Sequence, residues 1–260
     1  MFRINMCVAL PALVLVALVA QPAAADVTIY SEDFESMTPG GLVGQGGWTS
    51  SGTDVWVDAA DHLSGQSVSG DASNYSSALN RARHALGSLS QLDPAQVYTL
   101  DWNAYAHGPN AGQQLLGSRN SAFGFVDSNP AYAGVAGWWA DAWADKWTYD
   151  IRDITGGTAP FSTVSGDGID EVVSLRLVID GPNNQIKSYY DFGGGMTLHQ
   201  TDVITDAQIQ SIIAVGFQQD TRGDSEPAEY DNLLLTVVPE PSTLAMLSGL
   251  AGLILAWRKR

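Results

Sequence analysis

The stretch VVSLRLVIDGPNNQIKSYYDF, residues 172–192, decides the fold. Four apolar residues hold alternate positions in its first half: Val173, Leu175, Leu177 and Ile179. An alternation with a period of two is typical of a β-strand that buries one face. A Gly-Pro-Asn-Asn turn at 181–184 leads into a second strand-like run, Ile186–Phe192. Two such runs joined by turn residues predict a β-hairpin.

Runs with similar chemistry lie on both sides of this hairpin. They are Val27–Phe34, Val97–Ala106, Ala122–Val126, Trp147–Ile151, Ile213–Gln218 and Tyr230–Val238. One segment favours a helix, because Thr205 and Asp206 can cap a short turn through Ala207–Ile212. Since the pattern contains no helix long enough for a parallel crossover, we predict an all-β fold, an antiparallel β-sandwich.

The net charge of the body excludes two classes of binding partner. Between Asp26 and Val238 there are 27 acidic and 8 basic residues, a net charge of −19 over 213 residues. Such a body repels nucleic acid and anionic membrane surfaces, because binding to both depends on Lys and Arg. With 45% hydrophobic and 9% aromatic residues the 260-residue chain can build a substantial core.

Residues 1–25 have the pattern of a secretory signal peptide. Arg3 precedes an apolar run, Val8–Ala20, that is short for a membrane span, and three alanines at 23–25 offer a cleavage site. We expect signal peptidase to cut before Asp26 and to remove Cys7, the only cysteine of the chain. The mature protein would then have no disulfide.

Residues 239–260 have the pattern of a second targeting signal, which consists of three consecutive parts. Pro239-Glu240-Pro241 is followed by an apolar stretch, Leu244–Trp257, and then by Arg258-Lys259-Arg260. As a helix this stretch would be about 21 Å long, shorter than the ~30 Å hydrocarbon core of a bilayer. We therefore expect a marginal transmembrane helix, with the basic tail inside and the body outside.

This C-terminal pattern resembles the PEP-CTERM sorting signal of Gram-negative bacteria. The matching residues are Pro239, Glu240, Pro241, Arg258, Lys259 and Arg260, with the apolar helix between them. The resemblance implies export across the inner membrane, transient anchoring, processing by exosortase near the Pro-Glu-Pro, and a link to exopolysaccharide and biofilm. A permanent single-pass anchor with a coincidental Pro-Glu-Pro is the alternative.

The body, 26–238, resembles the laminin-G-like, concanavalin A-type jelly rolls. Three motifs carry the resemblance: SEDFESMTPGGLVGQGGW at 31–48, LRLVIDGPNNQIKSYYDFGG at 175–194 and EYDNLLLTVV at 229–238. The resemblance implies that the opening segment pairs with the closing strand. Galactose-binding-like sandwiches open and close in a similar way, and they are the alternative fold.

Jelly rolls of this kind include glucanases, so we tested for an active site. Retaining hydrolysis needs two carboxyl groups ~5–5.5 Å apart, which alternate strand positions supply as Glu-x-Asp-x-Glu. Glu32-Asp33-Phe34-Glu35 and Asp167–Glu171 lack this spacing, and HExxH and Gly-x-Ser-x-Gly motifs are absent. We predict a non-enzymatic protein without catalytic residues. The alternative is a glycan-cleaving enzyme on the same scaffold.

Calcium is the candidate ion, because it takes 6–8 oxygen ligands. Oxygen-bearing side chains are dense near the end of the body: Asp220, Asp224, Glu226, Glu229 and Asp231. A structural calcium joins the first and last strands in related sandwiches, and the resemblance gives this role to Asp33 or Glu35 together with Asp231. A solvated acidic loop is the alternative, since no EF-hand spacing is present.

Aromatic residues concentrate between positions 138 and 149. They are Trp138, Trp139, Trp143, Trp147 and Tyr149. Indole rings can stack on sugars, so Trp139 and Trp143, with Asp141 for hydroxyl groups, are the candidate glycan-binding residues. Core packing is the alternative for these rings, since each buries ~150–250 Å². The favoured hypothesis is an exported, non-catalytic surface or matrix protein that binds extracellular polysaccharide, and a purely structural protein is a third possibility.

Overall fold

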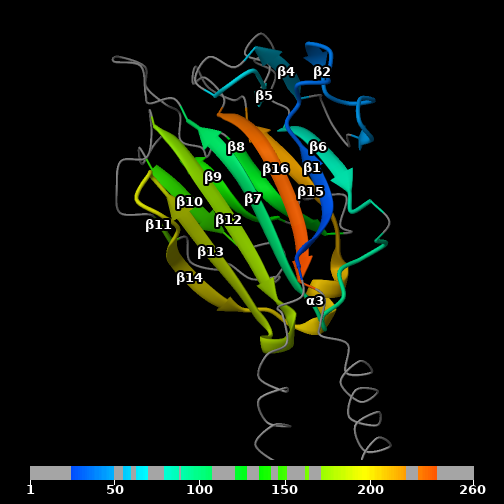
Figure 1. The fold of residues 1–260 in the computed structure, drawn as a ribbon, viewed down its shortest axis with the longest axis vertical. Coiled ribbons are helices and arrows are strands. Elements are labelled where there is room, and N and C mark those ends of the chain that lie inside the picture. Colours follow the sequence, from blue (N-terminus) through cyan, green and yellow to red (C-terminus); the bar gives the residue numbers. More distant parts are fainter. Residues whose placement is uncertain are drawn as a thin grey trace, which may run out of the picture. The chain divides into compact units, whose positions relative to one another are not determined.

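Two β-sheets packed face to face form the body of the protein in a computed structural model (Figure 1). The structure describes residues 25–49, 55–59, 63–69, 79–87, 89–106, 121–127, 135–141, 146–150, 162–163, 171–220 and 228–238. Within this body Val27–Val237 form one compact unit. The predicted antiparallel β-sandwich is confirmed.

Among the described residues, sheet A contains nine strands in the order β14-β13-β12-β7-β16-β5-β4-β2, and β1 also pairs with β16. Their bounds are β1 (Val27–Glu32), β2 (Gly40–Gly41), β4 (Trp56–Ala59), β5 (Gln66–Ser69), β7 (Val97–Tyr105), β12 (Val172–Asp180), β13 (Gln185–Asp191), β14 (Thr197–Val203) and β16 (Glu229–Val238). The opening strand therefore lies beside the closing strand, as the jelly-roll resemblance implied.

In the part of the chain that the structure describes, sheet B contains seven strands in the order β11-β10-β9-β8-β15-β6-β3. Their bounds are β3 (Trp48–Thr49), β6 (Leu79–Ala85), β8 (Ser121–Asp127), β9 (Val135–Asp141), β10 (Lys146–Asp150), β11 (Ser162–Thr163) and β15 (Ile212–Asp220). Strand β9 lies where the sequence pattern indicated only an aromatic-rich segment. Its antiparallel pairing with β10 shows that residues 138–149 belong to a hairpin.

The β12–β13 hairpin forms as predicted, with Asp180 paired to Gln185 and Ile179 to Ile186. A single 3-10 turn, Gly181–Asn183, connects the strands, and Asn184 ends it with a left-handed φ of 52°. Position 181 requires glycine because a Cβ there would lie 2.2 Å from the carbonyl oxygen of Pro94. The turn is thereby packed against the segment that leads into β7.

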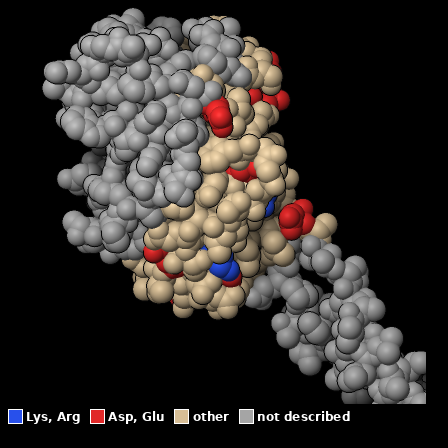
Figure 2. Space-filling model, turned by 90° about the vertical axis from the view of Figure 1, so that its left-hand side faces the viewer, with Lys and Arg blue, Asp and Glu red and all other residues tan. Residues whose placement is uncertain are grey.

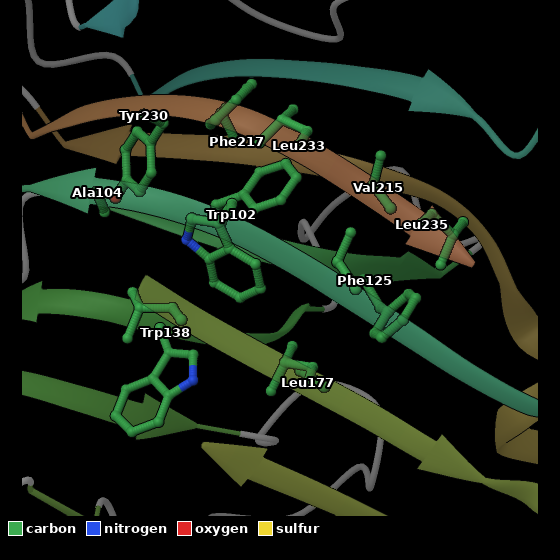
Figure 3. Packing of buried hydrophobic residues seen from close by; sticks show 14 of the residues in the cluster. Trp102, Ala104, Phe125, Trp138, Leu177, Val215, Phe217, Tyr230, Leu233 and Leu235 are labelled. Atoms are coloured by element: carbon green, nitrogen blue, oxygen red, sulfur yellow. The ribbon is translucent and has the colours of Figure 1, made fainter. Parts of the chain in front are cut away.

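The core lies between the two sheets and is rich in aromatic rings (Figure 3). Sheet A contributes Trp102 and Leu177, and sheet B contributes Phe123 and Phe217. The ring centroids of Trp102 and Phe123 are 5.0 Å apart in an edge-to-face arrangement. The four apolar residues that alternate in β12 are all fully buried, so the predicted period also identified the inner face.

Helix α3 (Asp206–Ser211) confirms the one helix that the sequence favoured. Thr205 caps it through a capping box, in which Thr205 and Gln208 exchange side-chain and backbone hydrogen bonds. The first strand, by contrast, ends at Glu32, short of the predicted Phe34, because Phe34 adopts a left-handed φ of 57°. Among the described residues, no helix is long and apolar enough to cross a membrane.

Candidate functional site

The strongest concentration of buried charge lies at the start of β16. Tyr230 points into the core, while Glu229 and Asp231 on either side of it are 4% and 2% exposed. Asn232 then has a left-handed φ of 56°, and the buried positions shift from Tyr230 to Leu233 and Leu235 across it. This local irregularity in the strand leaves two carboxyl groups buried beneath other segments.

Asp231 is surrounded by charges of its own sign. Its pKa is raised to about 6, chiefly by burial and also by the nearby carboxylates of Glu35, Asp33 and Glu32, while a hydrogen bond from the Asn232 backbone lowers it. Asn232 donates its backbone N–H and its side-chain amide to the two carboxylate oxygens of Asp231, at 2.6 and 2.9 Å. The four acids, Glu32, Asp33, Glu35 and Asp231, are called the acidic cluster below.

The turn after β1 holds three members of the acidic cluster. Glu32 accepts the backbone N–H of Phe34 at 3.0 Å, and Asp33 accepts that of Glu35 at 3.2 Å. A left-handed conformation is rare for a bulky residue such as Phe34, and the buried Phe34 ring holds it in place. Glu32 and Glu35 therefore lie on either side of this turn and not along one strand.

Two further contacts connect the β4–β5 hairpin to these acids. Glu35 accepts the backbone N–H of Gln66 at 2.9 Å, and a Cβ at Gly65 would lie 1.6 Å from its Oε1 atom. Glu229 accepts the backbone N–H of Leu63 at 3.2 Å. The carboxylates thus tie the turn after β1, the hairpin and β16 together. From the sequence, Glu229 was placed in an acidic loop. In the structure it is a buried residue at the start of β16, next to Tyr230.

The structure brings the three predicted calcium ligands, Asp33, Glu35 and Asp231, into one neighbourhood. Nevertheless, no three His, Cys, Asp or Glu side chains of the described segments are arranged to hold a metal ion. Asp224 and Glu226 lie outside the described residues. The donor chemistry fits calcium, whereas each carboxylate already accepts a local hydrogen bond, so the calcium site stays a prediction.

The predicted glycan-binding residues belong to the β9–β10 hairpin. Trp139 pairs with Thr148 and Asp141 with Lys146, while Trp143 lies in the connection, outside the described residues. Trp138 and Tyr149 are buried, which agrees with core packing for these two rings. The assignment of Trp139, Trp143 and Asp141 to glycan binding stays a prediction.

Sequence reasoning missed an aromatic group at the β13–β14 edge of the sandwich. The rings of half-buried Tyr190 and His199 lie 6.3 and 5.2 Å from the ring of buried Trp138, centroid to centroid, and half-buried Phe192 lies 5.2 Å from Tyr190. The register of β13 and β14 shifts beside His199, between the pairs Ser188–Gln200 and Tyr189–Leu198, and such bulges redirect side chains. The run Tyr-Tyr-Asp-Phe at 189–192 was the available sequence signal.

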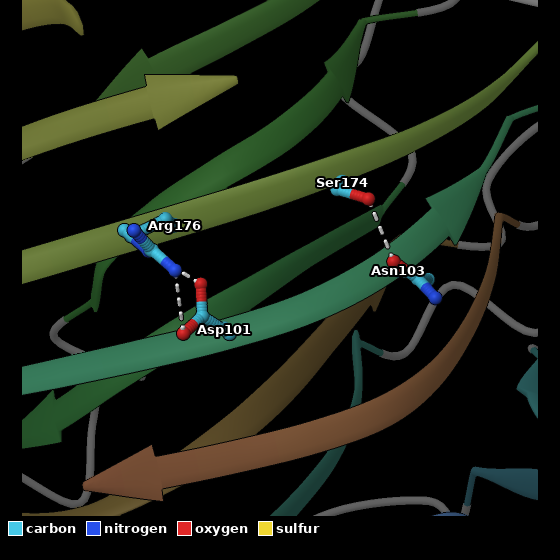
Figure 4. Close-up of polar contacts among 4 residues, drawn as sticks. All are labelled: Asp101, Asn103, Ser174 and Arg176. Atoms are coloured by element: carbon cyan, nitrogen blue, oxygen red, sulfur yellow. Dashed lines mark hydrogen bonds and ion pairs between the residues drawn. The ribbon is translucent and has the colours of Figure 1, made fainter. Parts of the chain in front are cut away.

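The outer face of sheet A is polar and partly exposed. On neighbouring β7 and β12, Arg176 donates to Asp101 at 2.6 Å, and Ser174 donates to Asn103 at 2.9 Å (Figure 4). On the face of the molecule that Figure 2 shows, acidic side chains are spread over the described residues and basic ones lie at few points.

Comparison with known proteins identifies the C-terminal segment. Residues 237–260 match the PEP-CTERM protein-sorting motif. The chain carries a PEP-CTERM sorting motif. The match includes Pro239-Glu240-Pro241 and the basic end Arg258–Arg260, and it confirms the predicted sorting signal. The motif implies recognition by exosortase and export to the surface or beyond, although its residues from Pro239 onward lie outside the described structure.

Solved structures show that the body has a lectin-type sandwich fold. Lectin II from Ulex europaeus matches with a TM-score of 0.53 at 12% identity, covering 82% of this chain and 100% of the lectin. Lectin I-B4 from Griffonia simplicifolia, solved in a metal-free form, matches with a TM-score of 0.54 at 9% identity, covering 80% and 99%.

A third structural match is a lectin from Bauhinia forficata in complex with GalNAc. Its TM-score is 0.51 at 11% identity, and the match covers 82% of this chain and 98% of that chain. No curated protein matches the sequence. These structural neighbours are lectins, and at such low identity they establish the fold alone.

Proposed function

We propose that this is an exported protein, processed by exosortase, whose sandwich binds extracellular polysaccharide without cleaving it. The observation that carries the proposal is a sorting motif that begins at Val237, inside the last strand of a lectin-type sandwich. A Gram-negative cell surface or biofilm matrix is the expected destination. Signal peptidase and exosortase are the expected processing partners, and the C-terminal helix is the transient anchor.

For the glycan contact we propose the β9–β10 hairpin. Trp138 occupies the inner face of β9, and positions 139 and 141 of the same strand pair with Thr148 and Lys146 of β10. With Asp141 at the end of β9 and Trp143 in the connection, the hairpin would offer aromatic surface and a carboxylate together. Sugar-binding sites combine stacking on aromatic rings with hydrogen bonds to the sugar hydroxyl groups in this way.

A glycan array probed with the chain from Asp26 to Val238 tests the proposal. We expect binding to at least one bacterial polysaccharide, and at least a tenfold loss in Trp139→Ala/Trp143→Ala. Tyr189→Ala is the matched control, because it removes a half-buried ring from β13, on the opposite sheet. Loss in Phe192→Ala with binding kept in the tryptophan variant would move the site to the β13–β14 edge, and an array without any binding would contradict the proposal.

The absence of catalysis is tested on the same material. We expect no release of reducing sugar from β-glucans or other common polysaccharides. Release that disappears in Glu35→Gln or Asp231→Asn would favour the glycan-cleaving alternative, because these two carboxyl groups lie close together. Glu171→Gln is the control, since Glu171 is exposed at the start of β12.

We further propose that the acidic cluster binds one structural calcium ion through Asp231 with Asp33 and Glu35. A dication would neutralise the repulsion that raises the pKa of Asp231 and would join the turn after β1 to β16. A ligand that binds only the folded state stabilises it by about 2.7 kcal/mol at a hundredfold excess over Kd. For a domain of this size that raises Tm by roughly 5–10 °C.

Thermal unfolding in millimolar calcium, compared with sodium chloride at matched ionic strength, measures this effect. The matched salt is needed because monovalent ions also screen a net charge of −19 between Asp26 and Val238. Asp231→Asn should remove most of the calcium-specific increase, whereas Glu171→Gln should keep it. Equal melting curves in the two salts would show that the cluster does not bind calcium.

A further inference from the structure

The two ends of the sandwich lie side by side. Strands β1 and β16 are antiparallel, and their terminal pairs are Val27 with Val237 and Thr28 with Thr236. Residue 27 follows the expected signal-peptidase site, and residue 237 opens the sorting motif. The residue that precedes Pro239 is thus the last residue of a strand, and no linker separates the fold from the Pro-Glu-Pro.

A register shift separates the two terminal pairs from the rest of the β1–β16 ladder. The register shifts between Thr28 and Tyr30, after which Tyr30, Ser31 and Glu32 pair with Leu235, Leu234 and Leu233. Beyond the shift Leu233 and Leu235 are buried, whereas Val27 is 51% and Val238 36% exposed at the free end. Val237 packs partly against the core, but with Val27 exposed this end buries less apolar surface than the pairs beyond the shift and opens locally at lower cost.

Pairing with β1 limits what a protease can reach. An enzyme that cuts near the Pro-Glu-Pro has to bind extended backbone on the N-terminal side of the bond, in the manner of a strand added to a sheet edge. At 236–237 the edge of β16 on that side is already occupied by Val27 and Thr28. Access to the sorting junction therefore requires these two pairs to separate.

We propose that the pairs Val27–Val237 and Thr28–Thr236 form a latch that controls cleavage by the sorting protease. The register shift at Thr28–Tyr30 lets the latch open while the rest of β1 stays on β16. The inference rests on the proposed processing by exosortase. It assigns to the mature N-terminus a role in the release of the C-terminus.

A reversible disulfide tests the latch in the full chain. Directly opposed residues on antiparallel strands have Cα atoms ~4.5–5.5 Å apart, within the range of a disulfide. Thr28→Cys/Thr236→Cys would lock the latch, and Ser31→Cys/Leu234→Cys would lock the same ladder beyond the shift. Both pairs join an exposed to a half-buried residue. Each is expressed with exosortase in a Gram-negative host, and processing is followed by pulse-chase and intact mass.

We expect the latch disulfide to slow C-terminal processing at least tenfold and dithiothreitol to restore the wild-type rate. The disulfide beyond the shift should leave the rate within twofold of wild type. The latch would be overturned if the chain with the latch disulfide were processed as fast as wild type, or if both disulfides slowed processing equally. A wild-type chain that keeps Arg258–Arg260 would overturn the proposed processing itself, and the latch with it.

A variant without cysteines keeps the test independent of disulfide formation. Val27→Gly/Thr28→Gly weakens strand pairing at the latch, because glycine is unfavourable in a strand and contributes no side chain. We expect processing at least twice as fast as in the wild type. Slower or unchanged processing, with an unchanged thermal unfolding curve, would contradict control by the latch.

Discussion

Asp180 and Asp231 are two buried aspartates of the same sheet with opposite electrostatic surroundings. Asp180 is 8% and Asp231 2% exposed. Burial opposes the charge of Asp180, but hydrogen bonds from Lys187 and Asn183 and the charge of Lys187 lower its pKa. At Asp231 burial acts together with three neighbouring carboxylates and raises the pKa to about 6.

The comparison shows that burial raises the pKa of both acids, and that only a neighbouring cation together with its hydrogen bonds reverses the shift, as at Asp180. Lys187 lies 2.7 Å from Asp180 across the β12–β13 hairpin. Asp231, at the other side of the sheet, receives hydrogen bonds from neutral Asn232. An uncompensated carboxylate near the opening turn therefore makes stability depend on pH and on cations at that place.

The largest expected effect is that of Asp231→Asn. The folded-state pKa of Asp231 lies above the ordinary 3.8, so its native state binds the extra proton and stability falls as pH rises from about 4 to above 6. Without divalent cations at pH 7.5, the asparagine variant should raise the free energy of unfolding by on the order of 2 kcal/mol. Urea unfolding across pH 4–8 measures the difference.

The gain should disappear near pH 4, where Asp231 is protonated in both folded and unfolded chains. Glu171→Gln removes one negative charge from an exposed site and serves as the control for net charge. A gain of equal size in both variants would show that overall charge, and not the acidic cluster, is responsible.

An intermediate effect is expected from Lys187→Met, which leaves Asp180 without its cation. We expect a loss of about 1–2 kcal/mol at pH 7, because a mostly buried carboxylate loses a charged hydrogen bond. The pKa of Asp180 lies below its ordinary value, so the loss should shrink as pH falls below about 4. The double variant Asp180→Asn/Lys187→Met should recover most of the free energy of unfolding that Lys187→Met loses. A double variant no more stable than Lys187→Met would contradict the pairing.

The smallest effect is expected from Arg176→Met. Arg176 contacts Asp101 at 2.6 Å, but the two side chains are 37% and 23% exposed. Exposed ion pairs contribute about 0–1 kcal/mol and are screened by salt. Denaturant unfolding should show a loss below ~1 kcal/mol that decreases in 1 M salt. A loss as large as that of Lys187→Met would mean that exposure does not explain the difference between the two pairs.

Local pattern predicted the parts of the fold that bury one complete face. The alternation in β7 and β12, the Gly-Pro-Asn-Asn turn and the Thr205 cap each need only neighbouring residues, and the structure confirms them. The sorting motif is equally local, since protease and membrane read it as a linear segment. Strands β5, β6 and β14 were missed, because their polar residues lack the alternation that marks a half-buried strand.

The sequence by itself thus determined an acidic β-sandwich with a C-terminal sorting signal. The hydrophobic period and the turn chemistry depend only on near neighbours in the sequence, and the net charge depends only on composition. Tertiary structure alone decided which acids are buried and what faces them. Asp33 and Asp231 are 198 positions apart in the sequence, and they become neighbours only because β1 pairs with β16 and Phe34 turns the chain back. The pKa of Asp231 depends on that pairing, because Coulomb interactions follow distance in space and not along the chain.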